Sequence, residues 1–377
     1  MKVLHLGKFD GDVGGIERHL RALLGAMPDG VDVVNLVANQ RPITDRHRDR
    51  GYLTVRAASY GTLASVALAP SMPALAGALH REHRFDIVHL HFPDPLGQLV
   101  ATALPRGIRR VISWHSDIIK QQWALPLYAP FLQSFVSNAD ALIGATPQHF
   151  SSSTQIPPPR DSQIREVIPY GFDPAPFAWT SATRAKQVEL ASQRSARPLI
   201  LTIGRHVYYK GFDVLIRSLR EVDADLWIGG RGPLTDSLHR VAQECGAADR
   251  VRFLGFIPDD QLVAYYDACD VFCLPSTERA EQFGLVQLEA MHCGKPVVAT
   301  RLGTGVEYVT IDGSTGLLVA PDDPIELAAA LRSLLADADV RRRFGEAGKR
   351  RVQEVFSVDQ MVTKTIDVYR RVLAVGK

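Results

Sequence analysis

The sequence has few cysteines and no long apolar run. No stretch approaches the roughly 18 apolar residues that a membrane-spanning helix needs, so we expect a soluble chain. The N-terminal segment 1–7 is too short and too soon interrupted for a secretory signal, and it is predicted to be a buried strand. These absences favour a cytoplasmic protein. The four cysteines show neither the spacing of a disulfide framework nor that of a zinc site. They are Cys245, Cys269, Cys273 and Cys293.

A strong net charge is also absent. Lys and Arg number 43 against 41 Asp and Glu, which gives +2 and argues against nucleic acid, because a nucleic-acid-binding domain usually carries a basic stripe. Basic residues nevertheless gather in two predicted loops, and they raise the hypothesis of a surface that faces anionic lipid. Solvated loop charges are the alternative. The residues are Arg41, Arg46, His47, Arg48 and Arg50 in one loop, and Arg106, Arg109 and Arg110 in the other.

The length of 377 residues exceeds the usual limit of a single core, so two domains are expected. Short apolar runs alternate with helical patterns in both halves, which predicts parallel sheets with crossover helices. The predicted strands are 3–6, 31–37, 87–91, 110–114 and 141–145, then 199–203, 225–228, 251–253, 271–274 and 296–299. The fold class is therefore α/β, with two doubly wound domains.

Three segments are predicted to connect these domains. Residues 151–159 are rich in serine and proline and are predicted to be a loop, 171–176 to cross between the domains, and 179–198 to lead onward. In the tail, 357–360 has the pattern of a capping box, and apolar residues recur at helical spacing up to Val372. An amphipathic terminal helix follows, although periodicity does not decide which domain it packs on.

Between Glu281 and Glu289 the chain is predicted to pass from a loop into a helix. The helix follows Gly284, where glycine frees the backbone, and it ends at Gly294 before Pro296. A helix N-terminus favours an anion, because its N–H groups are free and carry partial positive charge. One carboxylate before this N-terminus and another inside the helix indicate a phosphorylated, polyhydroxylated ligand, and sugar nucleotides fit that description.

Paired glycines, Gly14 and Gly15, follow the first predicted strand and open an amphipathic helix. Such glycines let backbone N–H groups approach a phosphate closely, and a plain tight turn is the alternative. They do not form the Gly-x-Gly-x-x-Gly pattern of a dinucleotide fold, which weakens a nicotinamide interpretation.

Two cations, Arg205 and Lys210, lie on a glycine-bounded loop after strand 199–203. They could neutralise a diphosphate leaving group, whereas a solvated loop is the competing interpretation. His115 follows strand 110–114 at its carboxyl end, where open parallel sheets bind ligands, and it could donate to a sugar hydroxyl or a phosphate. A structural histidine is equally consistent with this position. Three further histidines, His5, His89 and His91, are interpreted as core or rim residues.

Taken together, these residues resemble the family 4 glycosyltransferases in order and spacing. The resemblance spans nearly the whole chain and includes 168–173, Ile-Pro-Tyr-Gly-Phe-Asp, which is similar to the Ile-Pro-Asn-Gly-Val-Asp of the family. It implies the GT-B fold, with two facing Rossmann-like domains and the donor in the cleft between them. The acceptor-side domain would hold 1–173 with 358–377, and the nucleotide-sugar domain 174–357.

The resemblance also implies a role for each residue. Gly14 and Gly15 would give backbone N–H groups to the donor diphosphate, and Arg205 and Lys210 would hold the same phosphates. Glu281 would lie against the face of the reacting sugar, and Glu289 would bind the ribose hydroxyls. The backbone of Phe283, Gly284, Leu285 and Val286 would contact sugar hydroxyls and phosphate, and His115 would hydrogen-bond the sugar or the leaving group. The assigned catalytic residues are His115, Arg205, Lys210 and Glu281.

The family implies a retaining reaction without a metal, in which the departing phosphate helps to deprotonate the acceptor hydroxyl. No cofactor is expected beyond the nucleotide sugar. The sequence departs from the frequent Glu-Gly-Phe-Gly of the family at Gln282, and Glu278 is a rival for Glu281.

Within the family, 89–95, 115–121 and 302–306 resemble bacterial mannosyl- or rhamnosyltransferases that build lipopolysaccharide or exopolysaccharide. We therefore expect GDP-mannose as donor and a lipid-linked saccharide as acceptor, with peripheral contact to an anionic membrane at its cytoplasmic face. A UDP- or dTDP-sugar, an epimerase or hydrolase on the same frame, and a noncatalytic nucleotide-sugar-binding protein are the alternatives.

Overall fold

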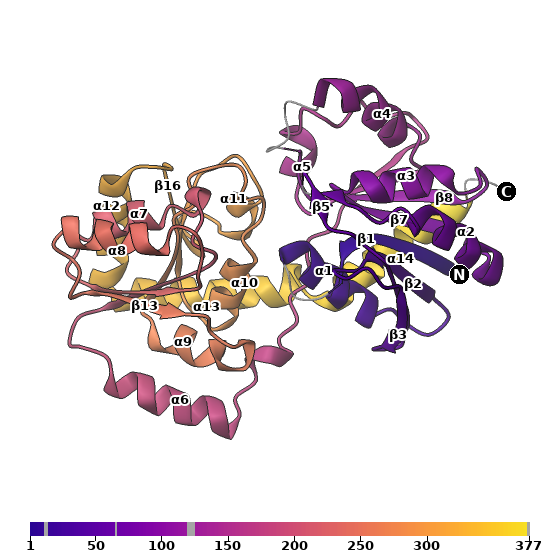
Figure 1. Ribbon diagram of the computed structural model, residues 1–377. Coiled ribbons are helices and arrows are strands. Elements are labelled where there is room, and N and C mark those ends of the chain that lie inside the picture. Colours follow the sequence, from indigo (N-terminus) through magenta and orange to yellow (C-terminus); the bar gives the residue numbers. More distant parts are fainter. Residues whose placement is uncertain (11–13, 65, 119–124, 375–377) are drawn as a thin grey trace. The chain divides into compact units, whose positions relative to one another are not determined.

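The computed structural model describes residues 1–10, 14–64, 66–118 and 125–374. The chain divides into two compact units (Figure 1). Unit 1 comprises Met1–Gly171 with Ser357–Lys377, and unit 2 comprises Phe172–Phe356. Parts of three predicted segments lie outside the described residues. They are Asp12 and Val13 of the first glycine motif, 119–121 of the segment after His115, and 375–377 of the tail.

Unit 1 is built on a sheet of eight strands in the order β10-β9-β8-β7-β1-β2-β4-β3. Only the pair formed by the last two, β3 and β4, is antiparallel. The strands are β1 (Lys2–Phe9), β2 (Asp32–Ala38), β3 (Asp45–Asp49), β4 (Tyr52–Ala57), β7 (Ile87–Phe92), β8 (Arg109–Trp114), β9 (Ala141–Gly144) and β10 (Ile164–Val167). A small antiparallel hairpin joins β5 (Thr62–Leu63) and β6 (Val66–Ala67).

Helices cover both faces of this sheet. They are α1 (Gly15–Gly25), α2 (Met72–His83), α3 (Pro95–Ala103), α4 (Leu125–Ser137), α5 (Gln148–Ser151) and α14 (Val358–Ala374). Because side chains alternate along a strand, one face of β1 presents Leu4 and Leu6 to a core shared with α2, α3 and α4, and the other presents Val3 to a core shared with α1 and α14. The terminal helix therefore belongs to unit 1.

Unit 2 holds a fully parallel six-stranded sheet in the order β13-β12-β11-β14-β15-β16. The strands are β11 (Leu199–Ile203), β12 (Asp225–Gly229), β13 (Val251–Gly255), β14 (Val271–Leu274), β15 (Val297–Thr300) and β16 (Gly316–Val319). The helices are α6 (Ser181–Ser192), α7 (Phe212–Ser218), α8 (Thr235–Glu244), α9 (Leu262–Ala268), α10 (Leu285–His292), α11 (Val306–Val309), α12 (Pro324–Ala336) and α13 (Ala338–Val355), with single 3₁₀ turns at Ala175–Phe177, Tyr208–Lys210 and Asp259–Gln261.

The α/β fold class and the ten predicted strands are confirmed. The segment 179–198, which was predicted only to lead onward, contains helix α6, which Thr180 caps by accepting from the backbone N–H of Thr183 at 3.1 Å. One other prediction is wrong. The basic segment around Arg46 and Arg48 is not a loop but the antiparallel edge strand β3, and charged side chains are typical of exposed sheet edges.

The strand order of unit 2 fixes where loops can meet. β11 and β14 are neighbours, yet the chain continues from β11 toward one edge of the sheet and from β14 toward the other. The loops at their carboxyl ends therefore diverge and leave a place for a ligand, as is general in doubly wound sheets. Unit 1 has the same arrangement at β1 and β7. Among the described helices, none combines the length and apolarity required to cross a bilayer.

Candidate active site

Lys210 and Glu281 meet at the carboxyl ends of β11 and β14. Lys210 Nζ donates to Glu281 Oε2 at 2.5 Å, and Ser276 Oγ donates to the same oxygen at 3.0 Å. Both charged side chains are nearly buried, with 12% and 11% of their surface exposed. The structure thus brings together two residues that lie 71 positions apart in the sequence, because their strands are neighbours at the point where the strand order reverses.

The backbone around Lys210 is fixed by Gly211, which has φ of +63°. A Cβ at this position would lie 2.0 Å from the carbonyl oxygen of Pro275, so only glycine permits the close approach of the two loops. The backbone N–H of Thr277 donates to the Tyr209 carbonyl at 2.8 Å and ties the loops together. Lys210 is therefore held by a rigid frame.

Opposing effects act on the charge of Lys210. Burial lowers its pKa, but the Glu281 carboxylate and its hydrogen bond outweigh burial, and the net pKa lies above the usual value. Arg205, which is exposed, lies close enough to act on Lys210 as a second positive charge. Two cations next to one carboxylate leave net positive charge for an anionic ligand.

Helix α10 begins where the sequence predicts. Gly284, its N-cap, has φ of +72°, and the backbone N–H of Gln287 donates to the Gly284 carbonyl at 2.9 Å. The ring of Phe283 is buried and packs edge-on against Phe356, so only the backbone of Phe283 is placed to serve a ligand. Leu285 and Val286 form the first turn of α10 and are half-buried.

Glu289 lies inside α10 and is buried, with 6% of its surface exposed. The hydroxyl of Tyr266, from α9, donates to Glu289 Oε2 at 2.7 Å. Burial together with the Glu289 carboxylate raises the pKa of Tyr266 well above its usual value, so the hydroxyl stays protonated and remains a donor. The sequence analysis missed Tyr266, and the only signal for it was an aromatic residue within an apolar helical pattern.

Gly14 and Gly15 lie in unit 1, at the start of helix α1. Gly14 is the extended N-cap of α1, and its carbonyl accepts from the backbone N–H of Arg18 at 3.1 Å. Gly15 is exposed. The Glu17 carboxylate lies beside Gly14, where a Cβ would meet it at 2.9 Å, and burial raises the pKa of Glu17. The helix N-terminus thus already has an acidic neighbour.

His115 lies in a buried group of histidines, with 3% of its surface exposed. Its Nε2 is hydrogen-bonded to Nδ1 of His91 at 3.0 Å, and its Nδ1 to the hydroxyl of Tyr170 at 2.6 Å. A ligand could reach this imidazole only by replacing one of those bonds. Burial lowers the pKa of His115 well below its usual value, so its imidazole is neutral at pH 7.

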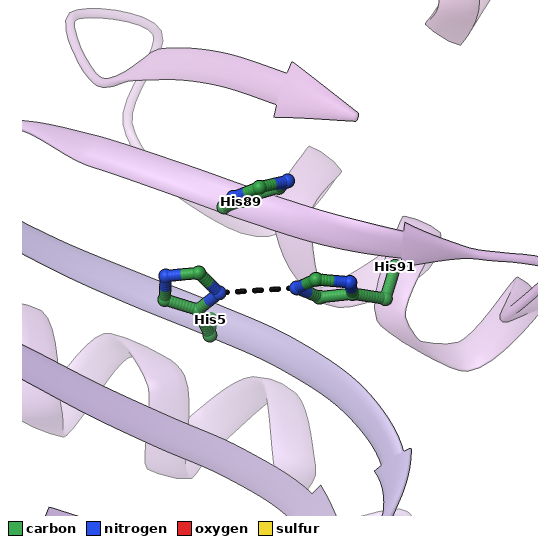
Figure 2. A group of neighbouring side chains, drawn as sticks. All are labelled: His5, His89 and His91. Atoms are coloured by element: carbon green, nitrogen blue, oxygen red, sulfur yellow. Dashed lines mark hydrogen bonds between the residues drawn. The ribbon is translucent and has the colours of Figure 1, made fainter. Parts of the chain in front are cut away.

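The histidine group extends along the sheet. Figure 2 shows His5 on β1 and His91 on the neighbouring strand β7 pointing toward each other, with His89 on the same face of β7. His5 Nδ1 lies 3.1 Å from His91 Nε2. The prediction that His5, His89 and His91 are core or rim residues is confirmed, since all three are buried.

The histidines could also converge on a metal. In each of two groups of three, the candidate ligand atoms lie within 4.8 Å of one another. The groups are His5, His89 and His91, and His19, His91 and His115. Both ring nitrogens of His5, His89, His91 and His115 already have hydrogen-bond partners, whereas Nδ1 of His19 has none among the described residues. A metal would have to displace existing bonds.

Comparison with known proteins defines the class. Residues 14–171 match the model of the glycosyl transferase 4-like domain, and residues 185–351 match that of glycosyl transferases group 1. With the two parallel-sheet domains, these matches identify a glycosyltransferase of GT-B fold. The chain belongs to the family 4 glycosyltransferases, as the resemblance implied.

Relatives of known activity transfer sugars in polysaccharide and glycolipid synthesis. The D-rhamnosyltransferase WbpZ of Pseudomonas aeruginosa is 31% identical over 95% of this chain and 92% of its own. The O-antigen chain mannosyltransferase C of Escherichia coli is 28% identical over 80% of each chain. A GDP-mannose-dependent phosphatidylinositol monomannoside mannosyltransferase of Mycolicibacterium smegmatis is 31% identical over 89% of each.

Solved structures share the fold at lower identity. Sucrose-phosphate synthase from Thermosynechococcus elongatus matches with a TM-score of 0.80 and 24% identity over the whole of both chains. Alr3699/HepE of Anabaena in complex with UDP matches with a TM-score of 0.77 and 21% identity over 98% of this chain and 100% of the other. At this identity the structures establish the fold alone.

Proposed function

We propose that the protein is a retaining, metal-independent glycosyltransferase that moves a hexose, most simply mannose from GDP-mannose, to a lipid-linked saccharide. The observation that carries the proposal is the buried Lys210–Glu281 pair with Arg205 beside it, at the reversal point of the sheet and next to the start of α10. The mannosyl- and rhamnosyltransferase relatives support mannose or a related sugar.

Each charged group of unit 2 has a proposed task. Arg205 and Lys210 bind the two phosphates, and their positive charge stabilises the nucleoside diphosphate as it leaves. Glu281, held by Lys210 and Ser276, faces the reacting sugar. Glu289, held by Tyr266, accepts hydrogen bonds from the ribose hydroxyls. The backbone of residues 283–286, at the start of α10, binds sugar hydroxyls and phosphate.

The transfer step uses the leaving group itself as base. As the bond between the anomeric carbon and the phosphate oxygen breaks, the acceptor oxygen attacks from the same face, and its proton passes to the departing phosphate. Configuration is therefore retained, and no metal or protein base takes the proton. Charge stabilisation is the main catalytic effect. Gly14, Gly15 and His115 of unit 1 are proposed to act in the same reaction.

The acceptor is proposed to be presented at an anionic membrane. Exposed Arg46 and Arg48 on β3 supply positive charge, although Arg46 lies 3.5 Å from Glu82. Helix α4 contains no charged residue and exposes 89% of Leu127 and 40% of Phe131. Arginine side chains attract anionic headgroups, and apolar side chains enter the boundary with the acyl chains.

A donor panel tests the function. The wild-type protein, with EDTA present, is mixed with GDP-mannose, UDP-glucose, UDP-galactose, UDP-N-acetylglucosamine or dTDP-rhamnose, and melting temperature and nucleotide release are measured. We expect GDP-mannose alone to raise the melting temperature, because a ligand that binds only the folded state stabilises it. GDP should be released when a lipid-linked saccharide is present to accept the sugar, whereas release at the same rate without an acceptor would indicate a hydrolase. Glu281→Ala should lower the release rate by roughly 10²- to 10³-fold.

Other outcomes of the panel identify the alternatives. Stabilisation by a UDP- or dTDP-sugar would show that GDP-mannose is the wrong donor, while the proposed type of reaction would stand. Stabilisation without nucleotide release, even with lipid-linked acceptor present, would indicate a noncatalytic binding protein. The membrane contact is tested with acceptor in anionic and in neutral vesicles. If activity is the same in both, and if an Arg46→Ala and Arg48→Ala double variant is as active as the wild type, the proposed membrane contact is refuted.

A further inference from the structure

Four buried histidines of unit 1 belong to one continuous hydrogen-bonded chain, which contains more than the three residues of Figure 2. Tyr170 OH lies 2.6 Å from His115 Nδ1, His115 Nε2 lies 3.0 Å from His91 Nδ1, and His91 Nε2 lies 3.1 Å from His5 Nδ1. The chain continues from His5 Nε2 to Tyr369 OH at 3.2 Å.

Beyond Tyr369 two further bonds complete the chain. The Tyr369 hydroxyl lies 2.6 Å from His89 Nδ1, and His89 Nε2 lies 2.8 Å from Ser113 Oγ. The exposed surface of these residues ranges from 0% to 7%. Because water does not compete at such positions, each of the polar atoms depends on its partner in the chain.

The chemistry of neutral imidazole restricts the chain to two arrangements. A neutral imidazole has one N–H donor and one acceptor nitrogen. If His91 donates from Nε2 to His5, it must accept at Nδ1 from His115, and the reverse holds if it donates from Nδ1. His5, His91 and His115 therefore share one tautomer. If the three rings had different tautomers, two N–H groups or two lone pairs would face each other at a buried contact, which is unfavourable.

The burial of these rings supports the neutral form. Burial lowers the pKa of His5 to about 3 and that of His91 and His115 well below the usual value. After burial, neighbouring histidines lower the pKa of His91 further, because a proton on His91 would place its positive charge next to theirs. At neutral pH the chain is therefore uncharged, and only the direction of its hydrogen bonds is free to vary.

The direction determines what His115 can offer a ligand. A phosphate or sugar oxygen that replaces Tyr170 at Nδ1 receives a hydrogen bond only if that nitrogen carries the proton. In this arrangement His5 Nε2 is an acceptor, and the donor that faces it is the hydroxyl of Tyr369 on α14. Tyr369 in turn accepts from His89 Nδ1.

We propose that Tyr369 is a positioning residue for the transfer reaction, whose hydroxyl holds His115, through His5 and His91, in the tautomer with the proton on Nδ1. This inference rests on the proposed role of His115 toward the donor. Tyr369 does not touch the ligand itself, because two imidazoles stand between it and His115. The terminal helix thus contributes a polar group, as well as apolar packing, to unit 1.

Nitrogen NMR on the full chain with ¹⁵N-labelled histidine tests the proposal, since the ring nitrogen shifts report the tautomer directly. In the wild type we expect His5, His91 and His115 to be protonated on Nδ1. Tyr369→Phe should shift all three toward the other tautomer, whereas Tyr128→Phe should leave them unchanged. Tyr128 is the matched control, because its hydroxyl bonds Gln98 outside the chain. Different tautomers among the three wild-type rings, or a change at His5 alone, would overturn the proposal.

Activity of the same variants supplies the second measurement. The wrong tautomer of a histidine that acts as general base can lower kcat by about 10⁴-fold. His115 is proposed only to bind a ligand, so we expect Tyr369→Phe to have a smaller effect and to lower kcat by about tenfold. A kcat within twofold of wild type would refute the positioning role. If Tyr369→Phe does not fold, Ser113→Ala breaks the chain at its last bond, to His89, and should shift the same nitrogens.

The NMR measurement remains decisive even if the proposed function fails. Absence of nucleotide release from any sugar nucleotide would refute the function, while the tautomers of the free protein would still show whether the chain acts as a unit. EDTA is added to one sample, because a metal held by these imidazoles would set their tautomers instead. Nitrogen shifts that change on adding EDTA would overturn the proposal.

Discussion

The Lys210–Glu281 pair contributes to stability as well as to the proposed chemistry. Removing one partner of a buried pair leaves the other charge uncompensated and costs about 3–5 kcal/mol, whereas replacing both is often nearly neutral. We therefore expect Lys210→Met alone to lower the free energy of unfolding by that amount, and Lys210→Met with Glu281→Gln to recover most of it. Urea unfolding of Lys210→Met, of Glu281→Gln and of the double variant measures these free energies of unfolding.

Two consequences follow from that comparison. A single variant could lose activity because it is unstable or because a catalytic group is missing. The double variant is expected to be stable and inactive, so its loss of activity would report on the chemistry alone. The pKa of Lys210 is raised above 10.5, so its share of the stability is complete below about pH 10.5 and is lost at higher pH. Equal destabilisation by the single and double variants would show that the pair does not act as a unit.

At the scale of single residues, the sequence indicated which side chains were chemically capable but not which ones meet. Lys210 and Glu281 were each identified from loop and helix patterns, and their contact depends on the order of strands in the sheet. Tyr266 was not identified, because an aromatic residue in an apolar helix gives no sign of a hydroxyl that reaches Glu289. The role of His115 was predicted without its bond to Tyr170, which comes from a distant segment.

The two glycines that flank helix α10 allow two reasons for glycine to be compared within one element: a left-handed backbone and close packing. Gly284 and Gly294 flank this helix with φ of +72° and +70°, so alanine at either position adopts a strained left-handed backbone at a cost of about 1–2 kcal/mol. A Cβ at Gly284 would also lie 2.6 Å from Leu274 and 2.7 Å from the Gln287 amide, whereas a Cβ at Gly294 would have no neighbour among the described residues within 4 Å.

We expect Gly284→Ala to lower the free energy of unfolding by about 1–3 kcal/mol more than Gly294→Ala, because only the former overpacks the core. Urea unfolding of the two variants measures the difference, and backbone strain cancels between them. Donor-induced stabilisation should be lost only in Gly284→Ala, whose loop leads into the proposed donor site. Equal costs for the two variants would mean that the loop before α10 yields to a methyl group.

Elements with an apolar pattern were predictable and polar ones were not. The strands of the sheet interiors are short apolar runs, and β11 and β14 have the predicted bounds. Helix α6 buries only Thr183 and Leu190, so it has almost no apolar stripe from which periodicity could reveal it. Strand β3 is an edge strand of alternating charges, which resembles a basic loop in sequence.

For the whole molecule, two domains followed from the length and from the repeated alternation of strands and helices. The tail required more information, because a helical apolar face shows that a partner exists but not which one. The structure assigns α14 to unit 1, where Met361, Ile366 and Val372 share a core with Val3 and Ile87 of the sheet. The first and last segments of the chain are thus folded together.

Removal of residues 357–377 is therefore expected to unfold unit 1. Six side chains of α14 are buried in its core, and full burial of each contributes about 1.5–3 kcal/mol. They are Met361, Val362, Ile366, Val368, Tyr369 and Val372. Their sum is on the order of 10 kcal/mol, which is as large as the whole stability of a typical domain. The core of unit 2 includes none of these residues.

Hydrogen exchange measured by mass spectrometry tests this expectation in one sample. In the shortened chain, amides of β1, β7 and β8 should exchange fast, while those of β11 and β14 should remain as protected as in the full chain. A synthetic peptide of residues 357–377 added in excess should restore the protection of unit 1, and the same peptide with Tyr369→Phe should restore it less well. Retained protection of β1 without the peptide would show that the remaining core of unit 1 suffices, and α14 would then serve unit 1 chiefly through the hydrogen bonds of Tyr369.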